Sequence, residues 1–227
     1  MKWFHKKFNA KPILDRYMDA DFELFACGKD APSEKDVHAF EQTIGFGLPP
    51  EFVEFSTSPL GGVYIAVKEA IWARPQAYAV GPFWSFLYGL HTMGFGKGIP
   101  EWMDIRIQAQ KFKTDTGHNV VPFLKVIGDA DVYCFDSRGE IVRWDHETDE
   151  LQVQGRAFAE VLEYEVAKLK DRKERKKQNQ ELEATRSRRT PEREHCSLPA
   201  MGNIPRLVRC LEDVGEFYAS DAPLSLA

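Results

Sequence analysis

Several carboxylates follow one another with the spacing of a calcium-binding loop: Asp129, Asp131, Asp136 and Glu140. Glu140 stands eleven residues after Asp129, where an EF-hand places its bidentate glutamate. Such a loop also needs an oxygen ligand at its fifth position and a glycine at its sixth, but this chain has Tyr133 and Cys134 there. We therefore interpret these residues as a strand flanked by turns and predict no metal site.

Other patterns that could perform chemistry are incomplete. The segment Gly94–Gly98 could present backbone N–H groups to a phosphate, but His91 replaces the first glycine of a phosphate-binding loop and Gly98 replaces its hydroxyl residue. The histidines form no HExxH or HxH pair, the cysteines form no CxxC pair, and GxSxG is absent. We predict no catalytic residues and no cofactor, so the chain is not expected to be an enzyme. An enzyme whose site is assembled from distant segments is the alternative.

The charge of the chain is unevenly distributed. Residues 168–195 contain eleven Lys or Arg against six Asp or Glu, which leaves 19 basic and 29 acidic residues in the rest of the chain. An acidic body should repel nucleic acid and attract a basic protein partner. The alternative interpretation is an acidic surface that serves solubility alone.

The longest apolar stretches are shorter than the roughly 20 residues that a membrane helix requires, so we expect no membrane association. The first residues, MKWFHKKFNAKPILDRYMDADF, lack the apolar region and cleavage site of a secretion signal. We expect a cytoplasmic protein with reduced cysteines.

Signals for helices and strands alternate along the middle of the chain. Ser33 and Asp36 predict a helix start, because the Ser33 hydroxyl can accept a hydrogen bond from the Asp36 N–H. Gly45 predicts the end of this helix, and Pro49-Pro50 predicts the start of a second, short one. Runs rich in β-branched and aromatic residues predict strands at 63–67, 120–127, 132–135 and 140–144.

Two further segments complete the predicted body. Residues 70–98 are rich in aromatic residues and glycine and favour short strands and loops. Residues 100–112 predict a helix that covers the sheet, because four apolar residues recur at helical spacing: Trp102, Ile105, Ala109 and Phe112.

The carboxyl-terminal third is predicted to be helical and then irregular. After Gly155, five apolar residues form a helical stripe: Phe158, Val161, Leu162, Val166 and Leu169. The run Lys170–Lys177 has no apolar face, and it is either a solvated continuation of the helix or disordered. We expect a frayed helix and a flexible linker at 186–194. Residues 198–227 predict an amphipathic helix that docks on the body or on a partner.

Three segments, in this order, resemble the SUKH superfamily, which includes the Smi/Knr-type cell-wall regulators of yeast and many bacterial immunity proteins. They are IGFGLPPEFVEFSTSPLGGVYI at 44–65, VIGDADVYCFDSRGEIVRWDHET at 126–148 and AFAEVLEYEV at 157–166. The resemblance implies an α+β fold in which helices cover an antiparallel sheet, and it implies inhibition by binding, with no catalytic residues and no cofactor. We expect an N-terminal extension at 1–32, the SUKH-like domain at 33–169, a charged helix and linker at 170–197, and a C-terminal amphipathic helix at 198–227.

Bacterial members of the family are paired with toxins such as nucleases and deaminases, so the resemblance implies a cognate toxin domain as the partner. An acidic body suits this function, because a toxin that acts on nucleic acid carries a basic substrate groove. We expect five acidic residues near the predicted turns to contact the partner: Asp129, Asp131, Asp136, Asp145 and Glu147. Two alternatives stay open. The five residues could only cap strand ends, and the chain could be a regulatory adaptor that recruits partners through its tail.

Overall fold

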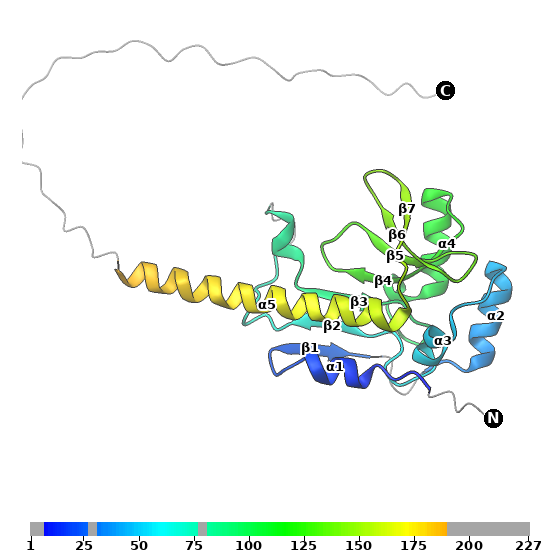
Figure 1. Cartoon of the computed structure of the whole chain (residues 1–227), viewed down its shortest axis with the longest axis horizontal. Coiled ribbons are helices and arrows are strands. Elements are labelled where there is room, and N and C mark those ends of the chain that lie inside the picture. The colour runs from blue at the N-terminus through cyan, green and yellow to red at the C-terminus, as the bar shows by residue number, and fades with distance from the viewer. Residues whose placement is uncertain (1–6, 27–30, 77–80, 190–227) are drawn as a thin grey trace, which may run out of the picture. The chain divides into compact units, whose positions relative to one another are not determined.

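The computed structural model describes residues 7–26, 31–76 and 81–189 (Figure 1). The described residues up to Arg188 form one compact unit. Seven strands make a single antiparallel sheet in which neighbours in the sequence are also neighbours in space. The strands are β1 (Phe22–Phe25), β2 (Tyr64–Val67), β3 (Gly89–Thr92), β4 (Val121–Val126), β5 (Val132–Phe135), β6 (Ile141–Asp145) and β7 (Glu150–Val153).

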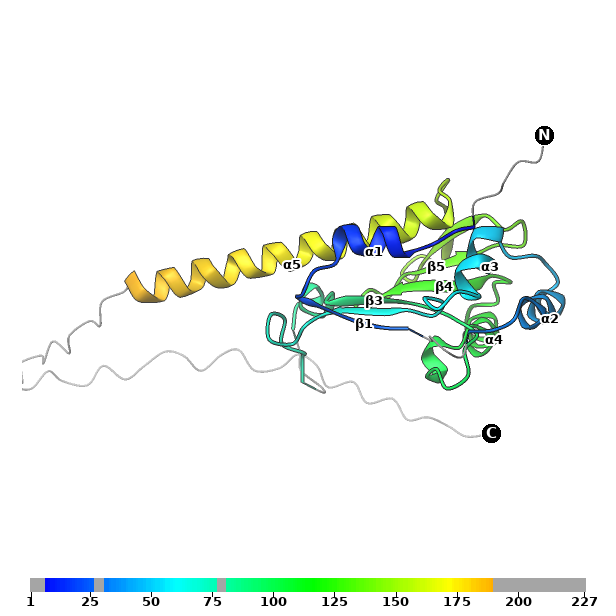
Figure 2. The same cartoon turned by 90° about the horizontal axis from the view of Figure 1, so that it is seen from below.

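Helices lie on both faces of this sheet, which confirms the predicted α+β class. Figure 2 shows α1 and α5 on one face and α4 on the other. The helices are α1 (Lys11–Tyr17), α2 (Glu34–Ile44), α3 (Pro50–Ser56), α4 (Ile105–Thr116) and α5 (Phe158–Arg189), with the 3-10 turns η2 (Phe83–Phe86) and η3 (Glu101–Met103). None of the helices in the described ranges has an apolar run that could cross a bilayer.

The main core lies between the sheet and α5. The predicted stripe of α5 is buried along its whole length, from Phe158 at 1% exposure to Leu169 at 0%. Phe52 of α3 packs edge to face on Phe158, and the ring of Phe123 stacks on that of Phe135 with centroids 4.1 Å apart. Burial of each such side chain contributes about 2 kcal/mol, so this face holds most of the stability.

The second face of the sheet is covered over only part of its width. Helix α4 packs there with Phe112 on Trp144, above a small cluster that contains Cys134 and Val142. The prediction that Trp102 lies on the buried face of this helix is wrong. Asp104 caps the helix by accepting a hydrogen bond from the Arg106 N–H, so α4 begins at Ile105 and Trp102 lies in η3 before it.

The predicted helix boundaries between β1 and β2 are confirmed. Ser33 and Asp36 form a reciprocal capping box, which is worth about 1 kcal/mol to a helix. Gly45 ends α2 in a left-handed conformation with φ of 83°, which a side chain would disfavour. The next helix begins directly after Pro49, as Pro49-Pro50 predicts.

Helix α5 continues through the charged run as far as Arg189. The run was expected to be solvated, but Lys173 is only 1% exposed because its ammonium lies between Asp19 and Asp21. Lys177 pairs with Asp21 as well, at 3.0 Å. Helix α1 and strand β1, both before the expected boundary at residue 32, are therefore attached to α5 as well as to the sheet. The predicted helix at 198–227 lies outside the described residues.

Candidate functional site

The turn between β6 and β7 concentrates negative charge. We call Asp145–Glu150 the acidic hairpin, since four of its six residues carry carboxylates: Asp145, Glu147, Asp149 and Glu150. The Asp145 carboxylate accepts hydrogen bonds from the N–H groups of Thr148 and Glu147, which lower its pKa below the ordinary range. The side chains of Glu147 and Glu150 are exposed, so they present charge to solvent.

Asp149 fixes the conformation of this turn. It adopts φ of 57°, a left-handed conformation that aspartate tolerates better than most residues. Its carboxylate accepts a hydrogen bond of 2.7 Å from the Trp144 indole, which lowers the pKa of Asp149, and a second of 3.1 Å from His118. The acidic hairpin is thus held to the sheet by its own side chains.

Two more of the predicted residues, Asp129 and Asp131, lie on the neighbouring turn between β4 and β5. The Arg143 guanidinium pairs with both, at 2.9 Å and 3.1 Å. Asp131 also accepts hydrogen bonds from the backbone and the ring of His146, and the ring contact raises the pKa of His146. These bonds link the β4–β5 turn to the acidic hairpin.

The side chains that connect the β4–β5 turn to the acidic hairpin lie close together. Asp131, Asp145 and His146 each place one oxygen or nitrogen atom within 4.8 Å of the others. Arg143 and His146 already satisfy Asp131, so the contacts orient the two turns and offset part of their negative charge.

Asp136 lies apart from the other four, at the opposite end of β5. It caps the hairpin between β5 and β6 by accepting hydrogen bonds from the N–H groups of Arg138 and Glu140. Burial alone would raise its pKa, but these bonds hold the pKa below the ordinary value. The structure therefore brings together Asp129, Asp131, Asp145 and Glu147 and leaves Asp136 outside. The carboxylates of Asp129, Asp136 and Asp145 also accept hydrogen bonds from backbone N–H groups of their own turns, as expected if these residues only cap strand ends.

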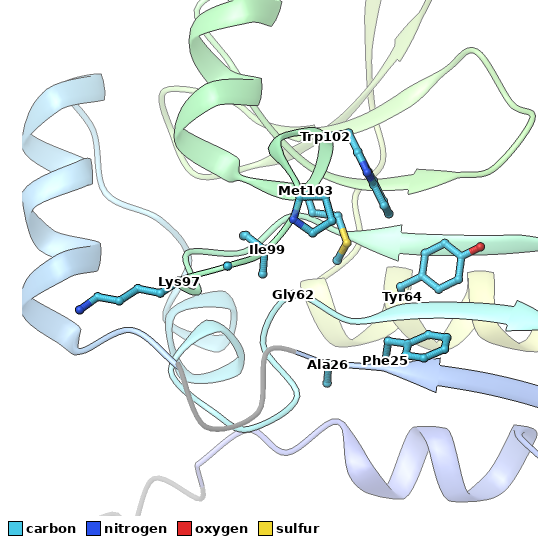
Figure 3. A pocket seen from close by; sticks show the side chains of 10 residues that line it. Phe25, Ala26, Gly62, Tyr64, Lys97, Ile99, Trp102 and Met103 are labelled. Atoms are coloured by element: carbon cyan, nitrogen blue, oxygen red, sulfur yellow. The ribbon is translucent and has the colours of Figure 1, made fainter.

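A cavity of about 480 Å³ opens beside β1, at the other edge of the sheet (Figure 3). We call it the aromatic groove, and its lining residues are Phe25, Ala26, Gly62, Tyr64, Lys97, Gly98, Ile99, Pro100, Trp102 and Met103. Phe25 and Tyr64 lie side by side on paired strands, with ring centroids 6.1 Å apart. Trp102 meets Tyr64 edge to face, and the side chain of Lys97 points away from these rings in Figure 3.

The groove is both apolar and accessible. Phe25 is 62% exposed and Trp102 is 47% exposed, although aromatic side chains of this size are usually well covered. Beneath Trp102 lies His91, whose ring is 4.8 Å from the indole. Its Nδ1 has no hydrogen-bond partner in the part of the chain that the structure describes. Burial, with a smaller contribution from Lys125, lowers the pKa of His91 to about 4, so the imidazole is neutral at physiological pH. The groove can bind apolar side chains.

The aromatic groove was not predicted from the sequence. Its residues come from β1, from β2 and from the segment around η3, which are far apart in the chain. The pattern Phe22-Glu23-Leu24-Phe25 was the available signal for β1, because it alternates apolar residues with one acidic residue. The spacing of Trp102 fits a helical face, so spacing alone does not exclude Trp102 from the helix. The N-cap at Asp104 is what places Trp102 before the start of α4.

A comparison with models of known protein families identifies the family of this chain. The model of the SMI1/KNR4 family (SUKH-1) matches residues 31–164, which is more than half of the chain. The match spans α2 through the first part of α5 and includes the acidic hairpin. No curated protein matches the chain. The match agrees with the order of the three resembling segments and with the antiparallel sheet, and the chain belongs to the SMI1/KNR4 family (SUKH-1).

Proposed function

We propose that this chain is a cytoplasmic, immunity-type binding protein that neutralises a cognate toxin domain by protein–protein contact. Membership of the SUKH group supports a binding role, because the resemblance implies inhibition without catalysis. The toxin that suits this chain acts on nucleic acid, since such a protein carries a basic substrate surface. An acidic inhibitor can occupy that surface and exclude the substrate.

The acidic hairpin is the observation that carries this proposal. Its four carboxylates lie within six residues, on a turn held by Asp145 and Asp149 and exposed at Glu147 and Glu150. Arg143 offsets the nearby Asp129 and Asp131, so the negative charge offered to a partner is concentrated on the hairpin. A rigid, charged projection loses little conformational entropy on binding and attracts a basic partner over a distance.

The toxin gene is expected beside the gene for this chain. Co-expression of the neighbouring toxin domain with the full chain should restore bacterial growth, and the two proteins should co-purify. Charge reversal by Glu147→Lys with Glu150→Lys should weaken protection, because the hairpin would then repel a basic surface. The matched control is Glu181→Lys with Glu183→Lys, which makes the same charge change at exposed positions of α5.

Two results would count against this function. Growth inhibition that the unaltered chain does not relieve would remove the toxin partnership. Equal loss of protection in the hairpin variant and the α5 control would show that net charge matters and that the hairpin is not the contact. The adaptor alternative predicts instead a partner that is lost when residues 190–227 are removed.

A further inference from the structure

The aromatic groove adjoins a free edge of the sheet. The strand order runs from β1 to β7, so among the strands of the described residues β1 has a neighbour on one side only. An unpaired edge strand presents N–H and C=O groups on which another extended chain can form hydrogen bonds. The groove and the edge meet at Phe25, the last residue of β1.

The register identifies which backbone groups of β1 point outward. The Val67 N–H donates to Tyr88 in the direction of β3, so Val67 does not bond to its partner Phe22 on β1. Bonding alternates along an antiparallel pair, and the Leu24–Ile65 pair two residues further on is therefore also non-bonded. The N–H and C=O of Leu24 face away from β2, and no described residue pairs with them.

The side chains of β1 add a charge and an apolar contact to this edge. Phe22 is buried in the main core, so Glu23 and Phe25 lie on the opposite face, where the groove opens. Glu23 forms no ion pair with any residue in the described ranges. Its register partner on β2 is Ala66, whose methyl group carries no charge that could neutralise the carboxylate.

We propose that the outer edge of β1 binds an extended segment of a basic partner protein that carries a Lys or Arg two residues from a bulky apolar residue. The segment adds as an eighth strand through the N–H and C=O of Leu24. Its cation lies opposite Glu23, and its apolar side chain packs against the ring of Phe25, which forms the outer wall of the aromatic groove. This surface lies at the opposite edge of the sheet from the acidic hairpin, so the inference goes beyond the proposed function.

Geometry favours this occupant. Glu23 and Phe25 would be non-hydrogen-bonded positions toward an added strand, where opposing side chains approach most closely. The ring of Phe25 is 62% exposed, so an aromatic or branched aliphatic side chain of the added strand can pack on it. The carboxylate of Glu23 favours a Lys or Arg opposite it. Because side chains on one face of a strand recur at every second residue, this cation lies two residues from the apolar residue opposite Phe25.

The test is a selection of random twelve-residue peptides, displayed on phage, against the full-length chain. Enriched peptides should contain Lys or Arg two residues from Phe, Trp, Leu or Ile. Synthetic copies should bind at least tenfold more weakly to Phe25→Ala, because the apolar side chain of the peptide then loses the ring that it packs on. Glu23→Lys should reverse the preference, so that acidic residues replace the basic ones in the enriched peptides. Leu24→Pro should abolish binding, since it removes the outward N–H while leaving the bonds to β2.

Controls separate this surface from the rest of the molecule. Glu147→Lys with Glu150→Lys should leave peptide affinity unchanged within about twofold, because these substitutions lie on the other edge. Each variant must unfold on heating at a temperature close to that of the unaltered chain, which shows that it is folded. If Leu24→Pro does not fold, the test rests on Phe25→Ala, at an exposed position.

Four outcomes would overturn the proposal. Selection could enrich no such peptides, or the enriched peptides could bind equally well to Phe25→Ala. A dimer in sedimentation equilibrium that Phe25→Ala dissociates would identify a second copy as the occupant. Binding that appears only in a full-length Leu207→Asp, Leu211→Asp variant would identify the chain's own tail instead.

Discussion

The two edges of the sheet use charged residues in opposite ways. Near β1, Lys173 is buried between Asp19 and Asp21, and His91 is buried in its neutral form. Near β7, Glu147 and Glu150 stay exposed on the acidic hairpin. Lys173, Asp19 and Asp21 thus hold α5 to the amino-terminal segment, whereas Glu147 and Glu150 remain exposed to a partner.

This difference teaches that composition does not by itself locate a binding surface. The basic run of α5 looks solvated in the sequence, yet one of its lysines is among the most buried residues of the chain. Two of the five predicted acidic residues, Asp129 and Asp131, are offset by Arg143. Only burial and pairing distinguish the carboxylates that stabilise the fold from those that are free to bind.

Acidification should produce the largest effect, and it should act at His91, on β3 beneath the aromatic groove. The pKa of His91 is 6.5 in the unfolded chain, whereas burial lowers it to about 4 in the folded chain. Stability is therefore fully present above pH 6.5 and is lost as the pH falls toward 4, by about 3 kcal/mol from this residue. Urea unfolding at a series of pH values measures this change in the free energy of unfolding.

The variant His91→Gln should lose most of this dependence between pH 6.5 and 4, while His38→Gln, at an exposed position, should keep it. A wild-type stability that stays flat across this range would show that His91 is not buried in its neutral form.

Lys173→Ala should have the next largest effect. Removing the ammonium leaves Asp19 and Asp21 facing each other without their shared cation. Breaking a buried pair commonly costs 3–5 kcal/mol, but both aspartates are partly exposed, so we expect about 2 kcal/mol. The control is Arg175→Ala, an exposed residue of the same helix, which should cost less than about 0.5 kcal/mol. Equal losses in the two variants would contradict the role of Lys173.

Much of the fold could be predicted from the sequence, because its signals are local. The capping box at Ser33, the left-handed Gly45 and the stripe from Phe158 to Leu169 each depend on neighbours within a few residues. Strands β1 and β7 were not predicted, because their sequences FELF and ELQV are not runs of β-branched and aromatic residues and each strand depends on pairing with a neighbour.

The candidate sites were less predictable. The acidic residues could be placed on turns, but their pairing with Arg143 and His146 depends on how three strands align. The aromatic groove is formed by Phe25, Tyr64 and Trp102, which lie on separate segments of the chain. The periodicity of one segment cannot predict a contact between segments that are far apart in the sequence.

Charge reversal at the acidic hairpin should have the smallest effect on stability and so sharpens the contrast between the edges. Glu147→Lys with Glu150→Lys should change the free energy of unfolding by less than about 0.5 kcal/mol, because both side chains are exposed. Urea unfolding at neutral pH is the measurement. A loss comparable to that of Lys173→Ala would mean that the hairpin carboxylates serve the fold.

The most direct test of the central claim is the rate at which the full chain associates with the neighbouring toxin domain, measured by stopped flow at several salt concentrations. The account predicts that the rate falls steeply with salt, and that the hairpin variant Glu147→Lys with Glu150→Lys associates at least tenfold more slowly than the α5 control at low salt. Equal rates for the hairpin variant and the α5 control, or a rate independent of salt, would contradict docking through the acidic hairpin.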